Sequence, residues 1–425
     1  MIGERIYYFR KLNGQTQEQL AHGICSISHL SKIENGHETP GPHILEHLCK
    51  RLNISLRIVD PQEAVNSMNK QLDSWYNHLC NRNIEESARL YSVLCKQVEL
   101  IEDPNTLLKY KLFTLKYTLL NQKLCKATHL VNELKKFKGK LKTDLAFYYF
   151  YILGLYHFKK GEYLKSLKHY IKAEESGEEL RIEAPELYYQ LAVVNMELYR
   201  TYYSTKYANH ALMLFNDNCN YVRSIECQNI SAINAIRVNH FTEAEKHLYN
   251  AFHVSRLLHQ EEGMSWTYCN FGYLSFKQGE LKESISYYEK SLDTNLEKQG
   301  EKNIITYYRI ARSYYELNDI KTAKKWIEKG LASAEELNNT EFTFHFKVFQ
   351  TKLSNNSHNH LEDLLKNKVI PHFQDKQIWF YVAKYAETLA EFYAQQFQYK
   401  TSAHFFKLVN EAQKRIYLEP EPQPV

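Results

Sequence analysis

The sequence of 425 residues predicts an all-α protein, with a small N-terminal domain followed by a long array of repeated helical hairpins. Two observations support this fold class. Helix breakers are scarce, with 14 glycines and 9 prolines, whereas 33 tyrosines and 21 phenylalanines supply large side chains that pack between helices. Small residues also recur with a period near forty residues between positions 154 and 390, which is typical of a repeat protein.

The first 56 residues are expected to form four short helices, because their capping residues follow one another closely. The first helix should end near Leu12. Thr16 and Gln19 have the spacing of a capping box at the start of the second helix. The third helix should begin after Ser26 and the fourth near Pro42, since serine caps helices and proline suits their first turn.

The stretch Thr16-Gln-Glu-Gln-Leu-Ala21, followed by Ile27-Ser-His-Leu-Ser-Lys-Ile-Glu-Asn-Gly36, resembles the helix-turn-helix domains of the Xre/Cro repressor family. The resemblance spans the whole segment 1–56 and implies binding to double-stranded DNA, with the third helix in the major groove. Base contacts are expected from four side chains, Ile27, Ser28, Ser31 and Lys32. Phosphate contacts are expected from three more, Gln17, Ser26 and His29.

Two further features of this segment bear on DNA binding. The resemblance implies that Arg10 and Glu34 form an internal ion pair, with a phosphate contact by Arg10 as the alternative. Residues 1–56 contain six Lys or Arg against five Asp or Glu, so one copy attracts DNA only modestly. We therefore expect a homodimer or tetramer that binds a pseudo-palindromic operator.

Residues 57–71 are expected to be a linker helix, because Asp60-Pro61 ends one helix and can start another. The repeat array should occupy residues 72–417. The remaining residues, 418–425, are rich in proline and are expected to be a disordered tail.

The array is expected to consist of about nine helical hairpins. Its small residues are spaced by 38, 40, 40 and 39 positions, with one more after two further periods: Gly154, Ala192, Ala232, Gly272, Ala311 and Ala390. A small residue at this point allows two helices to approach closely, and an aromatic side chain 12 to 16 positions later fills the space between hairpins. The pattern resembles the tetratricopeptide repeat with longer connections, which implies a right-handed superhelix. Segments 76–100, 106–137 and 343–373 are degenerate repeats.

Ligand contacts are expected on the inner face of the array, which the first helix of each hairpin lines in such repeats. Amide side chains suit the backbone of an extended peptide because they both donate and accept hydrogen bonds, and arginines suit carboxylates. The alternative is that these polar side chains are only solvated. The candidates are Gln190, Asn229, Arg237, Asn270, Tyr273, Arg309 and Arg312.

Together, the two halves resemble the RRNPP family of peptide-pheromone receptors. The resemblance implies a transcriptional regulator whose DNA binding is controlled by a short signalling peptide, as in quorum sensing. It also implies that Asn229 and Asn270 clamp the peptide backbone. Two other functions stay open. The array could dock and inhibit a protein such as a sporulation response regulator, or the chain could be a prophage repressor.

The sequence contains no nucleophile–base spacing, phosphate loop or metal motif, so we expect no enzyme activity, cofactor or bound metal. No apolar stretch approaches the length of a membrane helix, and the N-terminus lacks the pattern of a secretion signal. We therefore expect a cytoplasmic protein without a membrane partner. Its eight cysteines, which include no CxxC pair, should be reduced thiols.

Overall fold

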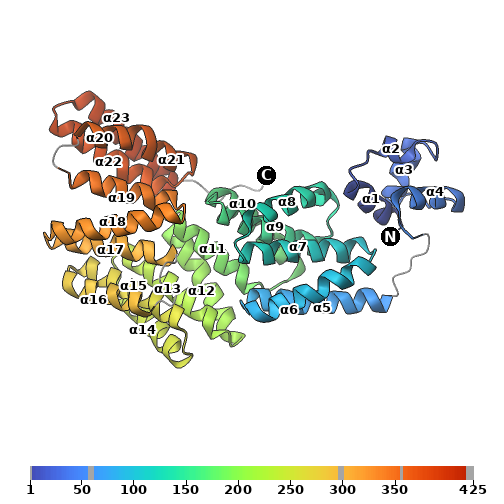
Figure 1. Ribbon diagram of the computed structural model, residues 1–425, viewed down its shortest axis with the longest axis horizontal. Coiled ribbons are helices and arrows are strands. Elements are labelled where there is room, and N and C mark those ends of the chain that lie inside the picture. Colours follow the sequence, from blue (N-terminus) through green and yellow to red (C-terminus); the bar gives the residue numbers. More distant parts are fainter. Residues whose placement is uncertain (1, 56–61, 295–300, 355–357, 418–425) are drawn as a thin grey trace. The chain divides into compact units, whose positions relative to one another are not determined.

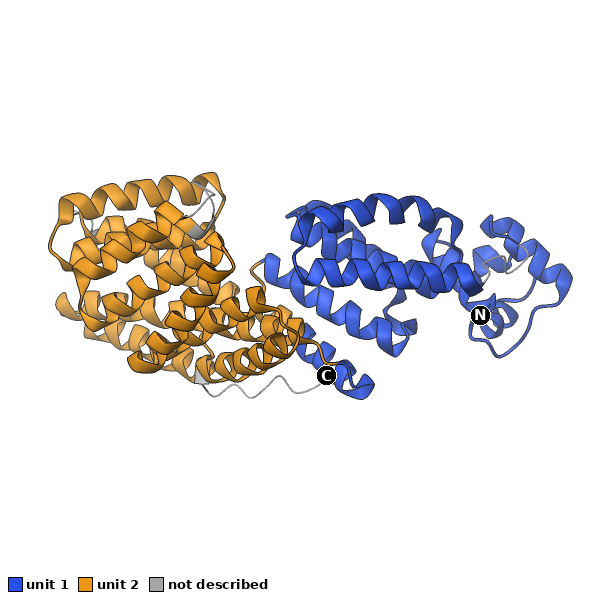
Figure 2. Cartoon of the chain, turned by 90° about the horizontal axis from the view of Figure 1, so that it is seen from below, with its two compact units in different colours: residues 1–160, 168–182 blue, residues 161–167, 183–425 orange. Residues whose placement is uncertain are grey.

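The computed structural model describes residues 2–55, 62–294, 301–354 and 358–417, and every regular element within these ranges is helical (Figure 1). The predicted all-α class is therefore confirmed. The chain forms two compact units, one of residues 1–160 and 168–182 and the other of residues 161–167 and 183–425 (Figure 2). Residues 57–61 of the predicted linker and the predicted tail 418–425 lie outside the described residues.

Unit 1 begins with the N-terminal domain, whose helices are α1 (Ile2–Leu12), α2 (Gln17–Ala21), α3 (Ile27–Glu34) and α4 (Pro42–Leu52). The predicted capping box is present, because the Thr16 side chain accepts a hydrogen bond from the Gln19 amide and the Gln19 side chain accepts one from the Thr16 amide. The domain has its own apolar core, centred on Ile6, Leu30 and Leu48. This core holds α3 at the surface of the domain.

The rest of unit 1 is a helical bundle. Its elements are α5 (Gln62–Cys80), α6 (Ile84–Gln97), the short 3-10 turn η1 (Val98–Leu100), α7 (Pro104–Leu120), α8 (Leu124–Leu134), the 3-10 segment η2 (Lys135–Lys140), α9 (Thr143–Lys159) and α10 (Tyr163–Leu180), whose first residues belong to unit 2. The fully buried Trp75 is central to α5–α7, because its indole N–H donates to the Ser87 carbonyl at 3.0 Å and its ring packs on Tyr91 and Tyr117.

Unit 2 is built from antiparallel helical hairpins. Their helices are α11 (Pro185–Glu197), α12 (Thr201–Asp217), α13 (Tyr221–Arg237), α14 (Phe241–Leu257), α15 (Glu261–Gln278), α16 (Leu281–Thr294), α17 (Glu301–Glu316), α18 (Ile320–Glu336), α19 (Thr340–Lys352), α20 (His358–Leu364), the π-helical turn η3 (Leu365–Val369), α21 (Ile370–Asp375), α22 (Trp379–Gln395) and α23 (Tyr399–Tyr417). The second half of the predicted degenerate repeat at 343–373 overlaps the broken run α20–η3–α21, where Pro371 has no N–H to donate.

The small residues of the repeat lie where helices cross. A Cβ atom added to Gly272 would lie 2.5 Å from the ring of Tyr288, and one added to Gly154 would overlap the ring of Tyr170 in the same way. Both tyrosines follow their glycine by 16 residues and are fully buried. The predicted pairing of a small residue with a later aromatic is thus confirmed, and Tyr288 also packs in one core cluster with Ile310 of the next hairpin.

No described helix has the length and apolar character that crossing a lipid bilayer would require. Within the same described ranges, no group of three or more His, Cys, Asp or Glu side chains is placed to hold a metal ion.

Candidate functional site

Helix α3 presents the predicted DNA-reading side chains. It starts after Ser26, whose hydroxyl accepts a hydrogen bond from the His29 amide at 3.2 Å. Ile27 is 48 % exposed, and Ser28 and Lys32 are also exposed, whereas Ser31 and His29 are half-buried. An isoleucine left so exposed at the start of α3 suits contact with a thymine methyl group.

An acidic residue lies beside these side chains. The Glu38 carboxylate is 3.4 Å from His29 Nε2 and 3.8 Å from Lys32 Nζ. It therefore lowers the positive potential of α3 in the free protein and holds Lys32 close to the helix. Exposed pairs of this kind are worth little, about 0–1 kcal/mol, so Lys32 can exchange Glu38 for a nucleic-acid acceptor.

Behind α3, Arg10 and Glu34 form the predicted internal ion pair. Arg10 Nε and Nη2 donate to the two carboxylate oxygens of Glu34 at 2.5 Å and 2.7 Å, and both residues are buried. Gln17, a predicted phosphate contact, donates from Nε2 to Glu34 Oε2 at 2.8 Å and remains partly exposed. Glu34 of α3 is thus bonded to Arg10 of α1 and to Gln17 of α2, so it connects the three helices. Removing one partner of the ion pair would leave a buried charge uncompensated.

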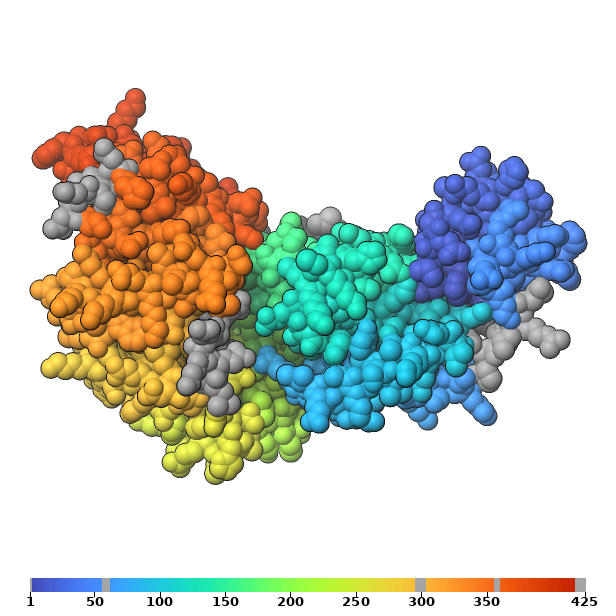
Figure 3. Space-filling view, in the orientation of Figure 1, coloured from blue at the N-terminus to red at the C-terminus, as the bar shows by residue number. Residues whose placement is uncertain are grey.

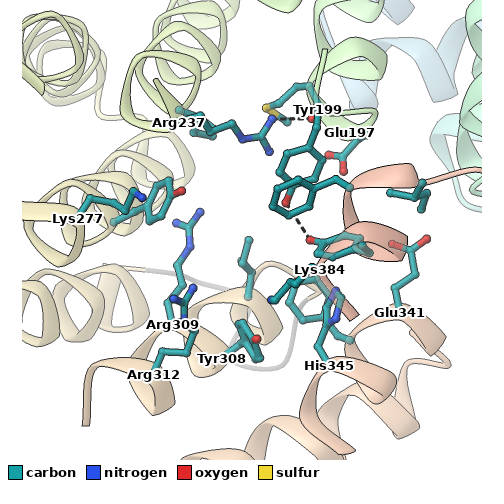
Figure 4. A pocket seen from close by; sticks show the side chains of 18 of the residues that line it. Glu197, Tyr199, Arg237, Lys277, Tyr308, Arg309, Arg312, Glu341, His345 and Lys384 are labelled. Atoms are coloured by element: carbon teal, nitrogen blue, oxygen red, sulfur yellow. Dashed lines mark hydrogen bonds between the residues drawn. The ribbon is translucent and has the colours of Figure 1, made fainter. Parts of the chain in front are cut away.

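Unit 2 contains a cavity of about 620 Å³, which is drawn from close by in Figure 4. Side chains from α11, α13, α15, α17, α19 and α22 line it. Four of the seven predicted ligand residues meet here: Arg237, Tyr273, Arg309 and Arg312. The volume falls within the range typical of sites for small organic ligands, which is roughly 300–1,000 Å³.

Each of the three arginines in this cavity rests on an aromatic ring. The guanidinium carbon lies 4.0 Å from the ring centroid of Tyr199 for Arg237, 4.7 Å from that of Tyr273 for Arg309, and 4.8 Å from that of Phe276 for Arg312. The guanidinium groups also donate to main-chain carbonyls, from Arg237 to Met196 at 2.7 Å and from Arg309 to Cys269 at 3.1 Å. Stacking and neutral acceptors orient these cations without neutralising them.

Two lysines and two carboxylates complete the charged lining of the cavity. Figure 4 shows Arg309 and Arg312 on one side and Glu197 and Glu341 on the opposite side. Burial and the nearby Glu197 carboxylate raise the pKa of Glu341 to about 7. Burial and the charge of Arg312 lower the pKa of Lys384 to about 8. With Arg237 and Lys277 also present, the cavity carries an excess of positive charge at neutral pH.

The end of the cavity near α22 is aromatic. The Tyr199 hydroxyl donates to that of Tyr381 at 3.1 Å, and His345 Nδ1 shares a hydrogen bond of 2.5 Å with the Tyr385 hydroxyl. Burial and the neighbouring cation Lys384 lower the pKa of His345 well below its usual value, so the imidazole is neutral. This end therefore suits an apolar or aromatic ligand group.

The structure places the other three predicted ligand residues, Gln190, Asn229 and Asn270, outside the cavity lining. Asn229 and Asn270 are fully buried. Asn270 Nδ2 donates to Asn229 Oδ1 at 2.9 Å, and Arg309 Nη1 lies 3.4 Å from Asn270 Oδ1. Asn229, Asn270 and Arg309 thus form a ladder of polar contacts across α13, α15 and α17, and Arg309 is the member that lines the cavity.

Sequence reasoning missed several cavity residues, among them Glu197, Lys277, Glu341 and Lys384. The spacing of the repeat in the sequence marks part of this set. Glu197, Arg237 and Lys277 each follow a small residue of the repeat by five positions, one helical turn beyond the column that contains Tyr273. Glu341 in α19 and Lys384 in α22 do not share this spacing from a small residue of the repeat, so the pattern does not mark them.

Comparisons with known proteins agree with this division into two kinds of module. Residues 6–59 match the helix-turn-helix family, and residues 263–336 match the tetratricopeptide repeat family. The chain is 29 % identical over 398 residues to the transcriptional activator NprA of Geobacillus stearothermophilus, which covers 92 % of this chain and 97 % of that protein. It is 21 % identical over 361 residues to the response regulator aspartate phosphatase I of Bacillus subtilis, covering 82 % of this chain and 90 % of that protein.

Two solved structures share the fold. The crystal structure of NprR in complex with its cognate peptide NprX is similar with a TM-score of 0.72 at 21 % identity, covering 82 % of this chain and 99 % of that one. A Rap protein complexed with competence and sporulation factor gives a TM-score of 0.72 at 22 % identity, covering 83 % of this chain and 99 % of that one. With its helix-turn-helix domain, its repeats and a relative that aligns with 92 % of its length, the chain is similar to the RRNPP family of regulators.

Proposed function

We propose that this protein is a transcriptional regulator whose binding to double-stranded DNA is controlled by a short signalling peptide in the cavity of unit 2. One observation carries the proposal: three arginines of α13 and α17, each backed by an aromatic ring, converge on one cavity in a chain that also has a helix-turn-helix domain. Among its relatives, NprA is named a transcriptional activator, and the NprR structure contains the peptide NprX.

The cavity favours a peptide that carries carboxylate groups. Arg309 and Arg312 offer guanidinium donors on one side, where a side-chain or C-terminal carboxylate would bind. Glu197 and Glu341, on the opposite side, suit a peptide N-terminus or basic side chain. The proposed peptide is therefore acidic towards one end, with an apolar residue for the aromatic end of the cavity.

The proposed DNA contacts come from α3 of two copies of the chain. Ile27, Ser28, Ser31 and Lys32 read bases, and Gln17, Ser26 and His29 contact phosphates. One helix-turn-helix domain has almost no net charge, so a homodimer or tetramer on a pseudo-palindromic operator supplies the necessary affinity. We place this activity in the cytoplasm.

The proposed switch is a shift between two arrangements of the oligomer. The cavity is lined by helices from most hairpins of unit 2, so a bound peptide contacts many of them at once. A difference in peptide affinity between the two arrangements of tens- to hundreds-fold, about 2–3 kcal/mol, is enough to change DNA occupancy. We infer that the protein binds the peptide without changing it covalently and has no enzyme activity.

A thermal-shift screen against synthetic acidic peptides tests the ligand half of this proposal. A peptide that binds the folded chain must raise its melting temperature, and calorimetry then gives the affinity. The double variant Arg309→Gln with Arg312→Gln should lower that affinity by at least roughly 100-fold, since two charge-assisted contacts worth about 1.5–3 kcal/mol each are lost. The matched control Arg256→Gln changes an exposed arginine of α14 and should leave the peptide affinity unchanged. Equal affinities for the control and the double variant would remove the arginines from the binding site.

A second candidate function is supported by the relatives named response regulator aspartate phosphatases, such as phosphatase I. In this alternative, the repeat array docks and inhibits a response-regulator protein. Size-exclusion chromatography of the purified chain with a purified response regulator distinguishes the two. A stable complex together with no DNA binding would favour this second function over the first.

A further inference from the structure

We propose that the lysine-rich segment 135–142, which belongs to the repeat region, forms a second DNA-contact surface that binds the phosphate backbone beside the helix-turn-helix domain. This inference rests on the proposed function in one respect, namely that the N-terminal domain binds DNA. The segment reads Lys-Lys-Phe-Lys-Gly-Lys-Leu-Lys, with five lysines and no acidic residue. All five lysines are exposed.

The segment is attached to the N-terminal domain at two points within unit 1. Phe137 is buried, and its ring stacks on that of Tyr8 in α1 with 5.1 Å between centroids. Lys140 Nζ donates to the Glu34 carbonyl at 3.0 Å and to Asn35 Oδ1 at 2.9 Å, at the end of α3. Lys140 Nζ also lies 4.0 Å from the ring centroid of Tyr7. These contacts fix η2 next to the helix that reads DNA, and Figure 3 shows α1 (dark blue) against the teal residues of the same unit.

Lys136 shares a surface hollow of about 570 Å³ with Arg10, Lys11 and the residues that lead into α2. In helix-turn-helix domains the helix before the recognition helix crosses the phosphate backbone. DNA bound by α3 would therefore pass close to this hollow. Lys135 and Lys138 lie in the same 3-10 segment, η2, as Lys136, and both are exposed.

The charge of the N-terminal domain explains what the segment adds. Its six basic residues face five acidic ones, and Arg10 is already paired with Glu34. The five lysines of segment 135–142 raise the excess of basic over acidic residues from one to six. Lysines that contact phosphates release counterions and strengthen binding to any sequence, so the segment contributes affinity rather than sequence preference.

The test uses the full chain with Lys135, Lys136 and Lys138 each changed to Gln. Phe137 and Lys140 stay, so both attachments of the segment are preserved. The control variant changes Lys321, Lys324 and Lys325, three exposed lysines of α18 in unit 2, to Gln and loses the same charge. Binding to a fluorescent mixed-sequence DNA duplex is measured by anisotropy over a range of salt concentrations. Thermal unfolding confirms that all three proteins are equally folded.

The wild-type chain and the control should bind the duplex with the same salt dependence. The segment variant should show a slope of log affinity against log salt that is smaller by roughly two to three, at about 0.9 per phosphate contact. Identical slopes for the segment variant and the control would overturn the inference while leaving DNA binding by α3 in place. Tighter binding by the segment variant would also overturn it and would show that the segment blocks the DNA surface. A wild-type chain that binds no duplex at low salt would overturn the proposed DNA-binding function itself.

Discussion

Tyr199 stacks on Phe380 with 3.6 Å between the ring centroids and 7° between the ring planes. Along the sequence, Tyr199 lies near the start of unit 2, in the turn after α11, and Phe380 lies near its end, in α22. The guanidinium of Arg237 also packs on Tyr199, at 4.0 Å from the ring centroid. One aromatic side chain thus joins the two ends of unit 2 beside the cavity and orients one of its arginines.

This relationship predicts that Tyr199→Ala loosens unit 2. The substitution removes both ring contacts and the hydrogen bond to Tyr381, and we expect the free energy of unfolding to fall by about 2–4 kcal/mol. Tyr199→Phe keeps the stacking and should cost only about 1 kcal/mol. Urea unfolding measures both changes. The control Tyr202→Ala, at a 75 % exposed position of α12, should have little effect, and an equal loss in the control would argue against a bridging role for Tyr199.

The asparagine ladder predicts an indirect effect on ligand binding. Asn270→Ala removes the donor to Asn229 and the acceptor near Arg309, so Arg309 should lose its fixed position in the cavity. We expect peptide affinity to fall about 10-fold, together with about 1–3 kcal/mol of stability. The control Asn195→Ala removes a buried amide that bonds to the Leu191 carbonyl in its own helix. Calorimetry that finds unchanged peptide affinity for Asn270→Ala would exclude Asn270 from the binding mechanism.

The raised pKa of Glu341 predicts a dependence of stability on pH. Burial and the Glu197 carboxylate raise it from 4.5 to about 7, so the folded protein keeps a proton that the unfolded chain releases. Stability from this group is complete below pH 4.5 and is lost as the pH rises to about 7. Urea unfolding at pH 5 and pH 8 should show a smaller difference for Glu341→Gln than for the wild type. An identical difference in both proteins would show that Glu341 titrates normally.

The same titration predicts how peptide binding responds to pH. Between pH 6 and pH 8, Glu341 gains negative charge and Lys384, whose pKa is about 8, loses positive charge. An acidic peptide should therefore bind more tightly at pH 6. In calorimetry at the two pH values, Glu341→Gln should retain part of this affinity at pH 8. Tighter binding of an acidic peptide at pH 8 would contradict the proposed placement of its carboxylates.

A final prediction separates DNA reading from ligand binding. Ser28→Ala combined with Lys32→Ala should abolish preference for the operator, because each good base contact is worth about 1–3 kcal/mol of discrimination. Peptide affinity should be unchanged, since the cavity is formed by other residues. Lys50→Ala, at an exposed position of α4, is the matched control for charge. Loss of peptide binding in the double variant would mean that these residues are structural.

Local signals predicted most of the fold. Thr16 and Ser26 cap their helices as expected, and the recurring small residues mark helix crossings because a close approach needs a missing side chain at one point. The Arg10–Glu34 pair was expected from the resemblance of the whole domain to a known family. These features depend on neighbours in the chain or on a repeated pattern.

The cavity could be predicted only in part. Arg309 and Arg312 were found from their place beside a small residue, but the meeting of Glu197 with Glu341 depends on hairpins far apart in the chain. Side-chain length also matters. Asn229 and Asn270 are too short to extend from their buried positions into the cavity, so they bond to each other, whereas Arg309 reaches it. Spacing alone specifies the face of a helix and not how far each side chain extends.

The ladder of Asn229, Asn270 and Arg309 also constrains which hairpins can be exchanged within this array. Each of its rungs comes from a different hairpin, and each amide is bonded to the neighbouring rung. Replacing the middle hairpin by one with an apolar residue in place of Asn270 would leave the buried oxygen of Asn229 without this donor and Arg309 without this acceptor. An apolar stack would tolerate such an exchange, whereas here the residue that the middle hairpin supplies is tied to polar partners in the hairpins on both sides.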